Sequence, residues 1–188
     1  MRYLKKKPDS TIVSRGWRYP QDARQIRDEL LREQRGFCAY SERFVHAIDS
    51  CDVEHFDPRL KTTDRDGYWN WYAVLHWVNS HKPRKIDPYL PMLPPHDPDV
   101  SRRIRYEDGQ FVAEDGDAPA ENLIKYLGWN RPELAEDRSR HVRRIRELRS
   151  LFGEDADGFR DFLRLHRENL SFATALEVEL GRDLSGLI

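Results

Sequence analysis

The stretch VEHFDPRLKTTDRDGYWNWYAVLHWVNSHK, from Val53 to Lys82, decides the fold of this chain. Glu54 and His55 close a short apolar run that predicts a strand. A polar loop follows, Asn70 comes 15 residues after His55, and Asn79 comes a further 9 residues along. The segment 69–82 around the two asparagines is apolar and aromatic enough to predict a buried helix. We therefore expect a strand, a loop and a helix that carry a carboxylate, an imidazole and two carboxamides.

These residue types suit the hydrolysis of a phosphodiester. A neutral imidazole can deprotonate water because its ordinary pKa lies near the working pH. A divalent cation neutralises the phosphate, and Mg²⁺ prefers oxygen ligands such as those of Glu and Asn. Glu54 and His55 are adjacent and point to opposite faces of a strand, so the chain must bend there to bring both to one site. The turn at Asp57-Pro58 permits such a bend.

Each residue also has a structural explanation when it is taken alone. His55 suits a buried histidine whose hydrogen bonds are satisfied, and Glu54 suits a surface carboxylate. Asn70 suits a helix cap, and Asn79 is ordinary in a last helical turn. The catalytic interpretation depends on all four residues occurring together at this spacing.

The four positions together resemble the ββα-metal motif of the HNH endonucleases. The resemblance implies that Glu54 is the strand metal ligand and His55 the general base. It also implies that Asn70 holds the base and its loop, and that Asn79 is the final metal ligand. Lys82 matches the basic residue often found three positions later. On this resemblance the cofactor is one catalytic Mg²⁺ or Mn²⁺ ion.

The chain departs from the many HNH proteins that carry two Cys-x-x-Cys pairs around a structural zinc. The first pair reads Cys38-Ala-Tyr-Ser41, and the second falls on Leu75 and Val78. A structural zinc needs four nitrogen or sulfur donors, so we expect no structural zinc and apolar packing in its place. Cys51 and His76 are the alternative donors for a rearranged zinc site.

Three flanking motifs narrow the resemblance to one HNH subgroup. They read MRYLKK at 1–6, QRGFCAY at 34–40 and NLIKYLGWNRPEL at 122–134. This subgroup consists of small proteins that partner an ATPase in bacterial antiphage systems, of the Septu type and the retron-associated type. The resemblance implies an ATPase partner and a role in antiviral defence.

Composition indicates a cytoplasmic protein. Hydrophobic residues make up 38% of the 188 residues and charged residues 35%, which predicts a highly charged surface around an aromatic-rich core. The chain has only two cysteines, which favours a reducing compartment over a disulfide framework. No apolar run approaches the ~20 residues that span a bilayer, and the basic start lacks the apolar region of a signal peptide. We therefore expect no membrane association.

The net charge of −1 argues weakly against a DNA partner, because a nucleic-acid backbone attracts a basic surface. The basic residues are clustered along the sequence, and this distribution favours a DNA partner more than the net charge does. A mixed, solvated surface is the alternative explanation for each basic cluster. The candidates for phosphate contact are Arg59, Lys61, Lys82, Arg84 and Lys85.

The element pattern predicts an α+β fold with an N-terminal helix, a ββα-metal (HNH) core and a helical C-terminal part. The N-terminal helix covers 20–35 with Pro20 in its first turn, and two strands occupy 37–44 and 45–56. Residues 83–101 hold six prolines and predict an irregular segment. The remaining expected elements are a hairpin over 104–113 that turns at Asp108-Gly109 and helices near 119–127, 131–152, 156–168 and 172–181, with Asn130 and Ser171 as caps. We expect residues 1–101 to form the nuclease core and residues 102–188 to form the hairpin and the helical part. The alternative is that both regions form one continuous domain.

The sequence thus predicts a metal-dependent HNH endonuclease that hydrolyses DNA, as the effector nuclease of an antiphage system. A competing interpretation is a non-catalytic module that keeps the HNH fold and docks an ATPase or nucleic acid. An RNase built on the same motif is a third interpretation, because nothing in the sequence indicates whether the substrate contains ribose or deoxyribose.

Overall fold

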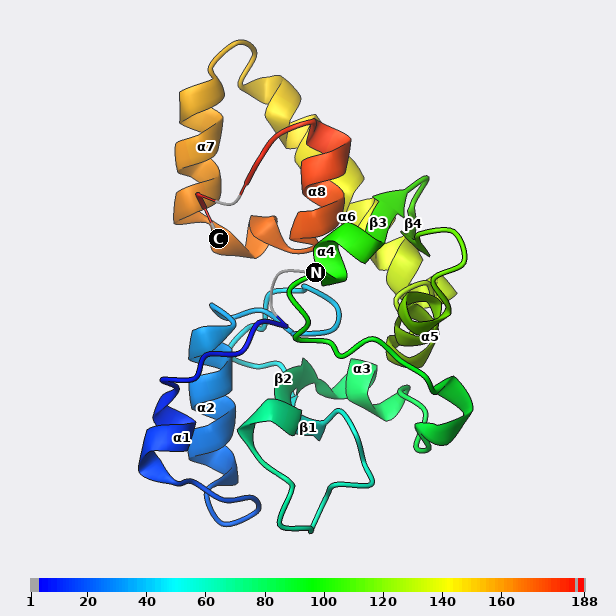
Figure 1. Cartoon of the computed structure of the whole chain (residues 1–188). Coiled ribbons are helices and arrows are strands. Elements are labelled where there is room, and N and C mark those ends of the chain that lie inside the picture. Colours follow the sequence, from blue (N-terminus) through cyan, green and yellow to red (C-terminus); the bar gives the residue numbers. More distant parts are fainter. Residues whose placement is uncertain (1–3, 185, 188) are drawn as a thin grey trace.

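The computed structural model describes residues 4–184, 186 and 187, and Figure 1 shows the whole chain. The first three residues of the MRYLKK motif lie outside the described residues. The chain is of the α+β class, with two small antiparallel sheets among its helices. None of the helices in the described part of the chain is long and apolar enough to cross a membrane.

The centre of the fold is the strand pair β1 (Cys51–His55) and β2 (Trp71–Leu75). The two strands are antiparallel, with Glu54 opposite Tyr72 and His55 opposite Trp71. Strand β2 runs directly into the short helix α3 (His76–Ser80). The order along the chain is therefore strand, loop, strand and helix.

The expected helix over 69–82 is wrong in its first half, because residues 71–75 form a strand. All five residues of β2 are buried, so the alternation that marks a strand with one wet face is absent. Large aromatic and β-branched side chains in this segment favour the extended backbone. Asn70 consequently caps no α-helix: it ends the 3₁₀ helix η1 (Tyr68–Asn70) just before β2.

The two strands expected at 37–44 and 45–56 are also wrong in their bounds and pairing. The first reduces to an isolated bridge between Phe37 and Phe44, and only the end of the second forms β1. The true partner of β1 is β2, which lies on the far side of the polar loop. The site loop therefore connects two paired strands instead of a strand and a helix.

Two N-terminal helices cover one side of this strand pair (Figure 1). Helix α1 (Thr11–Arg15) was not expected, and α2 (Ala23–Glu33) is shorter than the expected 20–35. Pro20 precedes α2 and its N-cap Asp22, so the proline does not occupy the first helical turn. Ile26 of α2 is buried in a second, smaller apolar cluster.

The segment 83–101 is largely irregular, as its prolines predict. It contains the 3₁₀ helix η2 (Asp87–Tyr89) and the start of α4 (Val100–Arg103). Backbone and side-chain hydrogen bonds tie it to the next helix: Leu93 N–H donates to the Pro119 carbonyl, and the Asn122 side chain donates to the Pro91 carbonyl. The prolines leave few backbone donors, so the segment wraps the core instead of joining a sheet.

The hairpin and the first C-terminal helix are confirmed. Strands β3 (Ile104–Glu107) and β4 (Gln110–Ala113) pair around a turn in which Asp108 and Gly109 have φ of 48° and 82°. Two consecutive left-handed residues make the turn type that suits a two-residue hairpin. Helix α5 (Ala118–Leu127) ends at Gly128, whose φ is 66°.

The last helices are α6 (Pro132–Leu151), α7 (Ala156–Leu165) and α8 (Ala173–Leu180), with the 3₁₀ helix η3 (Arg167–Leu170) before α8. Both expected caps are wrong. Arg131 is the N-cap of α6, while the Asn130 side chain accepts from Phe111 N–H and donates to the Phe111 carbonyl. Phe172 is the N-cap of α8, and Ser171 Oγ accepts a hydrogen bond from Phe44 N–H instead.

One apolar core extends across position 101. It includes buried residues from strand β2, the hairpin and helices α5 to α8, so the two expected regions share it. The buried side of α6 contains Leu134, Val142 and Ile145 but also Arg138, which is only 2% exposed. The guanidinium of Arg138 donates to the carbonyls of Trp129 and Gly109, both at 3.0 Å. These bonds give two of its nitrogens partners, while Nε is buried without one among the described residues, and the apolar pattern cannot reveal the position of this buried charge.

Candidate active site

A cavity of about 620 Å³ opens beside β1, between α2, the loop after β1 and the end of α3. Three of the four residues of the predicted motif line it, namely Glu54, His55 and Asn79. Asn70 is buried behind the cavity and is not part of its wall. All five residues of β1 border this cavity, and the strand keeps its regular pairing with β2 through His55, so the expected bend of the strand stays a prediction.

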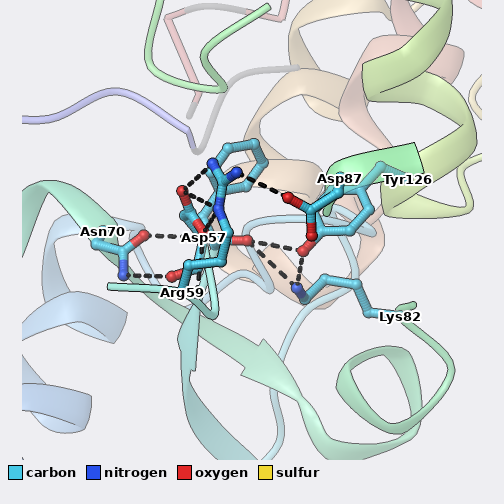
Figure 2. Close-up of polar contacts among 7 residues, drawn as sticks. Asp57, Arg59, Asn70, Lys82, Asp87 and Tyr126 are labelled. Carbon is cyan, nitrogen blue, oxygen red and sulfur yellow. Dashed lines mark hydrogen bonds and ion pairs between the residues drawn. The ribbon is translucent and has the colours of Figure 1, made fainter. Parts of the chain in front are cut away.

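Glu54 is buried and paired with a cation. The Lys82 ammonium lies 2.8 Å from its Oε1, and the side chains of Lys82 and Glu54 are 6% and 9% exposed. Lys82 also donates to the Phe56 carbonyl and to Tyr126 Oη, and Figure 2 shows the contact with Tyr126. Burial raises the pKa of Glu54, and Lys82 opposes that shift. Burial also lowers the pKa of Lys82. Both charged groups therefore lose hydration at this site, and their mutual attraction must offset that loss.

His55 is almost buried and meets an acidic side chain from the loop. Its Nε2 lies 3.0 Å from Asp66 Oδ2, although this contact is off the line of an ideal hydrogen bond. The Tyr19 ring packs edge-on against the imidazole, with 4.7 Å between centroids. Burial lowers the pKa of His55 and Asp66 opposes that shift. The imidazole therefore favours its neutral form, which is the form that accepts a proton.

Asn70 holds the loop closed. Its Oδ1 accepts from Asp57 N–H at 2.8 Å, and its Nδ2 donates to the Asp57 carbonyl and to Asp66 Oδ1 (Figure 2 shows the link to Asp57). The carboxamide thus joins both ends of the 57–66 segment. The Asn70 side chain reaches His55 through Asp66, whereas the resemblance implies that Asn70 holds the base as well as its loop.

Asn79 faces a second carboxylate on β1. Its Nδ2 donates to Asp52 Oδ2 at 2.8 Å, and His76 Nδ1 lies 2.8 Å from the same oxygen. Asp52 and Glu54 are two residues apart and share one face of the strand. Asp52 had no assigned role in the sequence, but alternation from Glu54 would have placed it beside the cavity.

The oxygen donors at this wall suit a hard cation. Glu54, Asp52 and Asn79 supply carboxylate and carboxamide oxygens, which are the groups that Mg²⁺ selects. Among the described residues, no three His, Cys, Asp or Glu side chains are grouped to hold a metal ion by themselves. Mg²⁺ keeps several waters and needs only one or two carboxylates, so Glu54 with Asn79 fits that requirement. The raised pKa of buried Glu54 indicates that it is under-compensated by Lys82 alone.

The predicted phosphate contacts separate into three groups. Lys61 and Arg84 line the cavity and are exposed, and Lys85 is exposed nearby. Lys82 lines the cavity but is paired with Glu54. Arg59 is paired with Asp57 and Asp87 at 2.8 and 3.0 Å, outside the residues of the cavity wall (Figure 2).

Helix α2 contributes two cations that sequence reasoning missed. Arg24 and Arg27 line the cavity opposite the loop, and both lie near Asp28, at 3.9 and 2.8 Å. They are three residues apart, a helical spacing that places them on one face. That spacing was visible in the sequence, but its relation to the site depends on how α2 packs against β1.

The positions of the missing zinc ligands lie in the apolar core. Cys38, Leu75 and Val78 are buried there, and Cys38 Sγ accepts from Leu75 N–H at 3.4 Å. Leu75 ends β2 and Val78 lies in α3, so the two residues belong to different elements, although the expected helix over 69–82 would have held both. Burial raises the pKa of the half-buried Cys51 to about 12, which disfavours the thiolate that zinc requires. The absence of a structural zinc stays a prediction.

No protein-family model matches this chain, and no curated protein or solved structure is significantly similar to it.

Proposed function

We propose that this protein is a metal-dependent DNA endonuclease of the HNH, or ββα-metal, kind. One observation carries the proposal: Glu54, His55 and Asn79 come from β1 and α3 to line one cavity, in the order strand, loop, strand and helix. The fold alone would not support an activity, because unrelated functions share small α+β folds. The support lies in the residue types and in their convergence.

Glu54 and Asn79 are the residues that would hold one Mg²⁺ or Mn²⁺ ion. When bound, that ion supplies positive charge to the phosphate and to the leaving oxygen. His55 takes the proton of the attacking water, and its lowered pKa keeps the imidazole ready to do so near neutral pH. Lys82 supplies the positive charge that Glu54 needs when no metal is present, and a bound ion would supply positive charge to the same carboxylate.

The charge of the cavity wall favours a polyanionic substrate. Five Lys or Arg side chains line the cavity, against the two carboxylates Asp52 and Glu54. This local excess of cations arises although the net charge of the chain is −1. Arg24 and Arg27 on α2 and Lys61 and Arg84 on the other wall are positioned to contact phosphates on both sides of His55. Phosphate contacts of this kind orient a nucleic acid without reading its sequence.

The role in antiphage defence, beside an ATPase, rests on the sequence resemblance. A second function, docking of a partner protein, is favoured by a groove of about 290 Å³ between α3 and α6. Leu75, Trp77, Val78 and Leu134 line the groove, and Trp77 is 42% exposed. Co-expression with the ATPase followed by size-exclusion chromatography tests this function. Separate elution at low and high salt would contradict it.

Plasmid cleavage tests the proposed nuclease activity. Purified wild type should relax supercoiled plasmid with Mg²⁺ or Mn²⁺ and not with EDTA, and His55→Ala should abolish this activity. A parallel RNA substrate distinguishes the RNase interpretation. The reactions are run with and without the ATPase, because a weakly charged nuclease gains affinity from a partner. Wild type that is inactive under every one of these conditions would contradict the proposal.

A further inference from the structure

We propose that Asp66 is the positioning residue of His55, fixing the imidazole in the tautomer that carries its proton on Nε2 and leaves Nδ1 as the basic nitrogen. The inference rests on the proposed function, because it assigns a role within the same reaction. Asp66 had no role in the sequence analysis.

The contacts of Asp66 hold its carboxylate in one orientation. Its side chain is 9% exposed, and its Oδ1 accepts two hydrogen bonds, from Asn70 Nδ2 at 3.0 Å and from Trp71 Nε1 at 2.9 Å. These two donors belong to the end of η1 and the start of β2, so the carboxylate is anchored to the strand pair that carries His55. The other oxygen, Oδ2, is left to face His55 Nε2 at 3.0 Å.

The chemistry of the contact selects one tautomer. A carboxylate only accepts hydrogen bonds, so the buried Nε2 that faces it is favoured as the N–H nitrogen. The hydrogen bond at one imidazole nitrogen decides which form the other nitrogen takes, and Nδ1 is then left with a lone pair. Nε2 and Oδ2 are 3.0 Å apart, which is within hydrogen-bond reach, although the contact does not have the direction of a hydrogen bond. When the proton of water passes to Nδ1, the adjacent carboxylate offsets the positive charge of the imidazolium.

The same contacts give Asn70 an indirect role in orienting the His55 ring. Asn70 binds Asp57 and Asp66 at once, so it fixes the loop at both ends. Asp66 then transmits this position to the imidazole. The order of contact is Asn70, Asp66 and His55, and each step is a direct polar contact.

Asp66→Asn is the decisive variant. An asparagine can keep its oxygen at the Oδ1 position, where it still accepts from Asn70 and Trp71. Its amide nitrogen then faces His55 Nε2 and donates to it, so the imidazole proton should move to Nδ1. We expect the rate of plasmid cleavage to fall by up to about 10,000-fold, which is the loss seen in serine proteases when the same exchange imposes the wrong histidine tautomer. Asp64→Asn, which removes the same charge from an exposed position in the same loop, should change neither the tautomer nor the rate.

Nitrogen-15 NMR of selectively labelled histidine reads the tautomer without depending on activity. At mildly alkaline pH the wild-type His55 should show a protonated Nε2, and Asp66→Asn should show a protonated Nδ1. A wild-type spectrum with the proton on Nδ1 overturns the proposal and needs no variant that folds. An Asp66→Asn protein that retains the wild-type tautomer and rate also overturns it. Failure of wild type to cleave any nucleic acid would contradict the proposed function, and the spectra would still decide the role of Asp66.

Discussion

Replacing Lys82 by methionine should destabilise the metal-free protein strongly, and a divalent cation should restore much of the loss. Methionine keeps most of the aliphatic stem of lysine but removes the ammonium that lies 2.8 Å from Glu54. Glu54 then stays behind as a buried carboxylate without its cation. Breaking a buried pair by removing one partner costs about 3–5 kcal/mol, because the remaining charge is not compensated.

The direction of the pH effect follows from Glu54. Burial already raises its pKa, and loss of Lys82 removes the group that opposes this rise. A carboxyl whose folded pKa is raised binds protons more readily in the folded state, so its contribution to stability grows as pH falls. The deficit of Lys82→Met should therefore shrink between neutral pH and the ordinary pKa of a glutamate, near 4.5.

Urea unfolding in EDTA and in Mg²⁺ measures both effects. In EDTA we expect the free energy of unfolding of Lys82→Met to be about 3–5 kcal/mol lower than that of wild type. Mg²⁺ at about 100 times its Kd adds roughly 2.7 kcal/mol to a state that binds it. The gain should be larger in the variant, since no lysine competes for Glu54. Lys85→Met, at an exposed position, should match wild type. A Lys82→Met protein as stable as wild type in EDTA would refute this reasoning.

Two further predictions concern packing and a second buried cation. Leu75→Ala should lower the free energy of unfolding by roughly 2–5 kcal/mol, because Leu75 is buried beside Cys38 and Val78. A zinc-selective chelator, which leaves Mg²⁺ in place, should not change Tm. A Tm that collapses on removal of zinc would point to a structural zinc. Burial lowers the pKa of Lys6, which donates to the Trp71 carbonyl, to about 7. Between pH 7 and 10.5 the unfolded chain therefore binds more protons at Lys6 than the folded chain does. As pH rises through this range, the free energy of unfolding of wild type should increase relative to that of Lys6→Met, by up to ~1.4 kcal/mol per pH unit. Parallel pH profiles of the two proteins would show that Lys6 has its ordinary pKa.

Local signals in the sequence predicted the elements whose conformation is decided locally. The turn Asp108-Gly109 needs two left-handed residues, which few residue pairs tolerate, and the hairpin follows from it. Gly128 ends α5 for the same steric reason. The grouping of Glu54, His55 and Asn79 at the cavity was likewise predictable, because it depends on spacing along one short stretch.

Features decided by packing escaped the sequence. Strand β2 is buried on both faces, so its residues lack the alternation that separates a strand from a buried helix. Arg138 lies in the apolar stripe of α6 because carbonyls of distant residues accept its hydrogen bonds. Asp66 reads as one more polar loop residue until the loop folds back onto His55. In each case the contact depends on how the folded chain packs, and no periodic pattern in the sequence encodes it.

The most direct test of the account is single-turnover cleavage of plasmid DNA as a function of Mg²⁺ concentration, with wild type, Glu54→Gln and His55→Ala compared side by side. Glu54→Gln should need a much higher Mg²⁺ concentration to reach half of its maximal rate, because it loses a carboxylate ligand. His55→Ala should bind Mg²⁺ with nearly the wild-type midpoint, followed directly by calorimetry, but lose turnover at saturating metal. Cleavage by His55→Ala at the full wild-type rate would contradict the assignment of this cavity as a nuclease site.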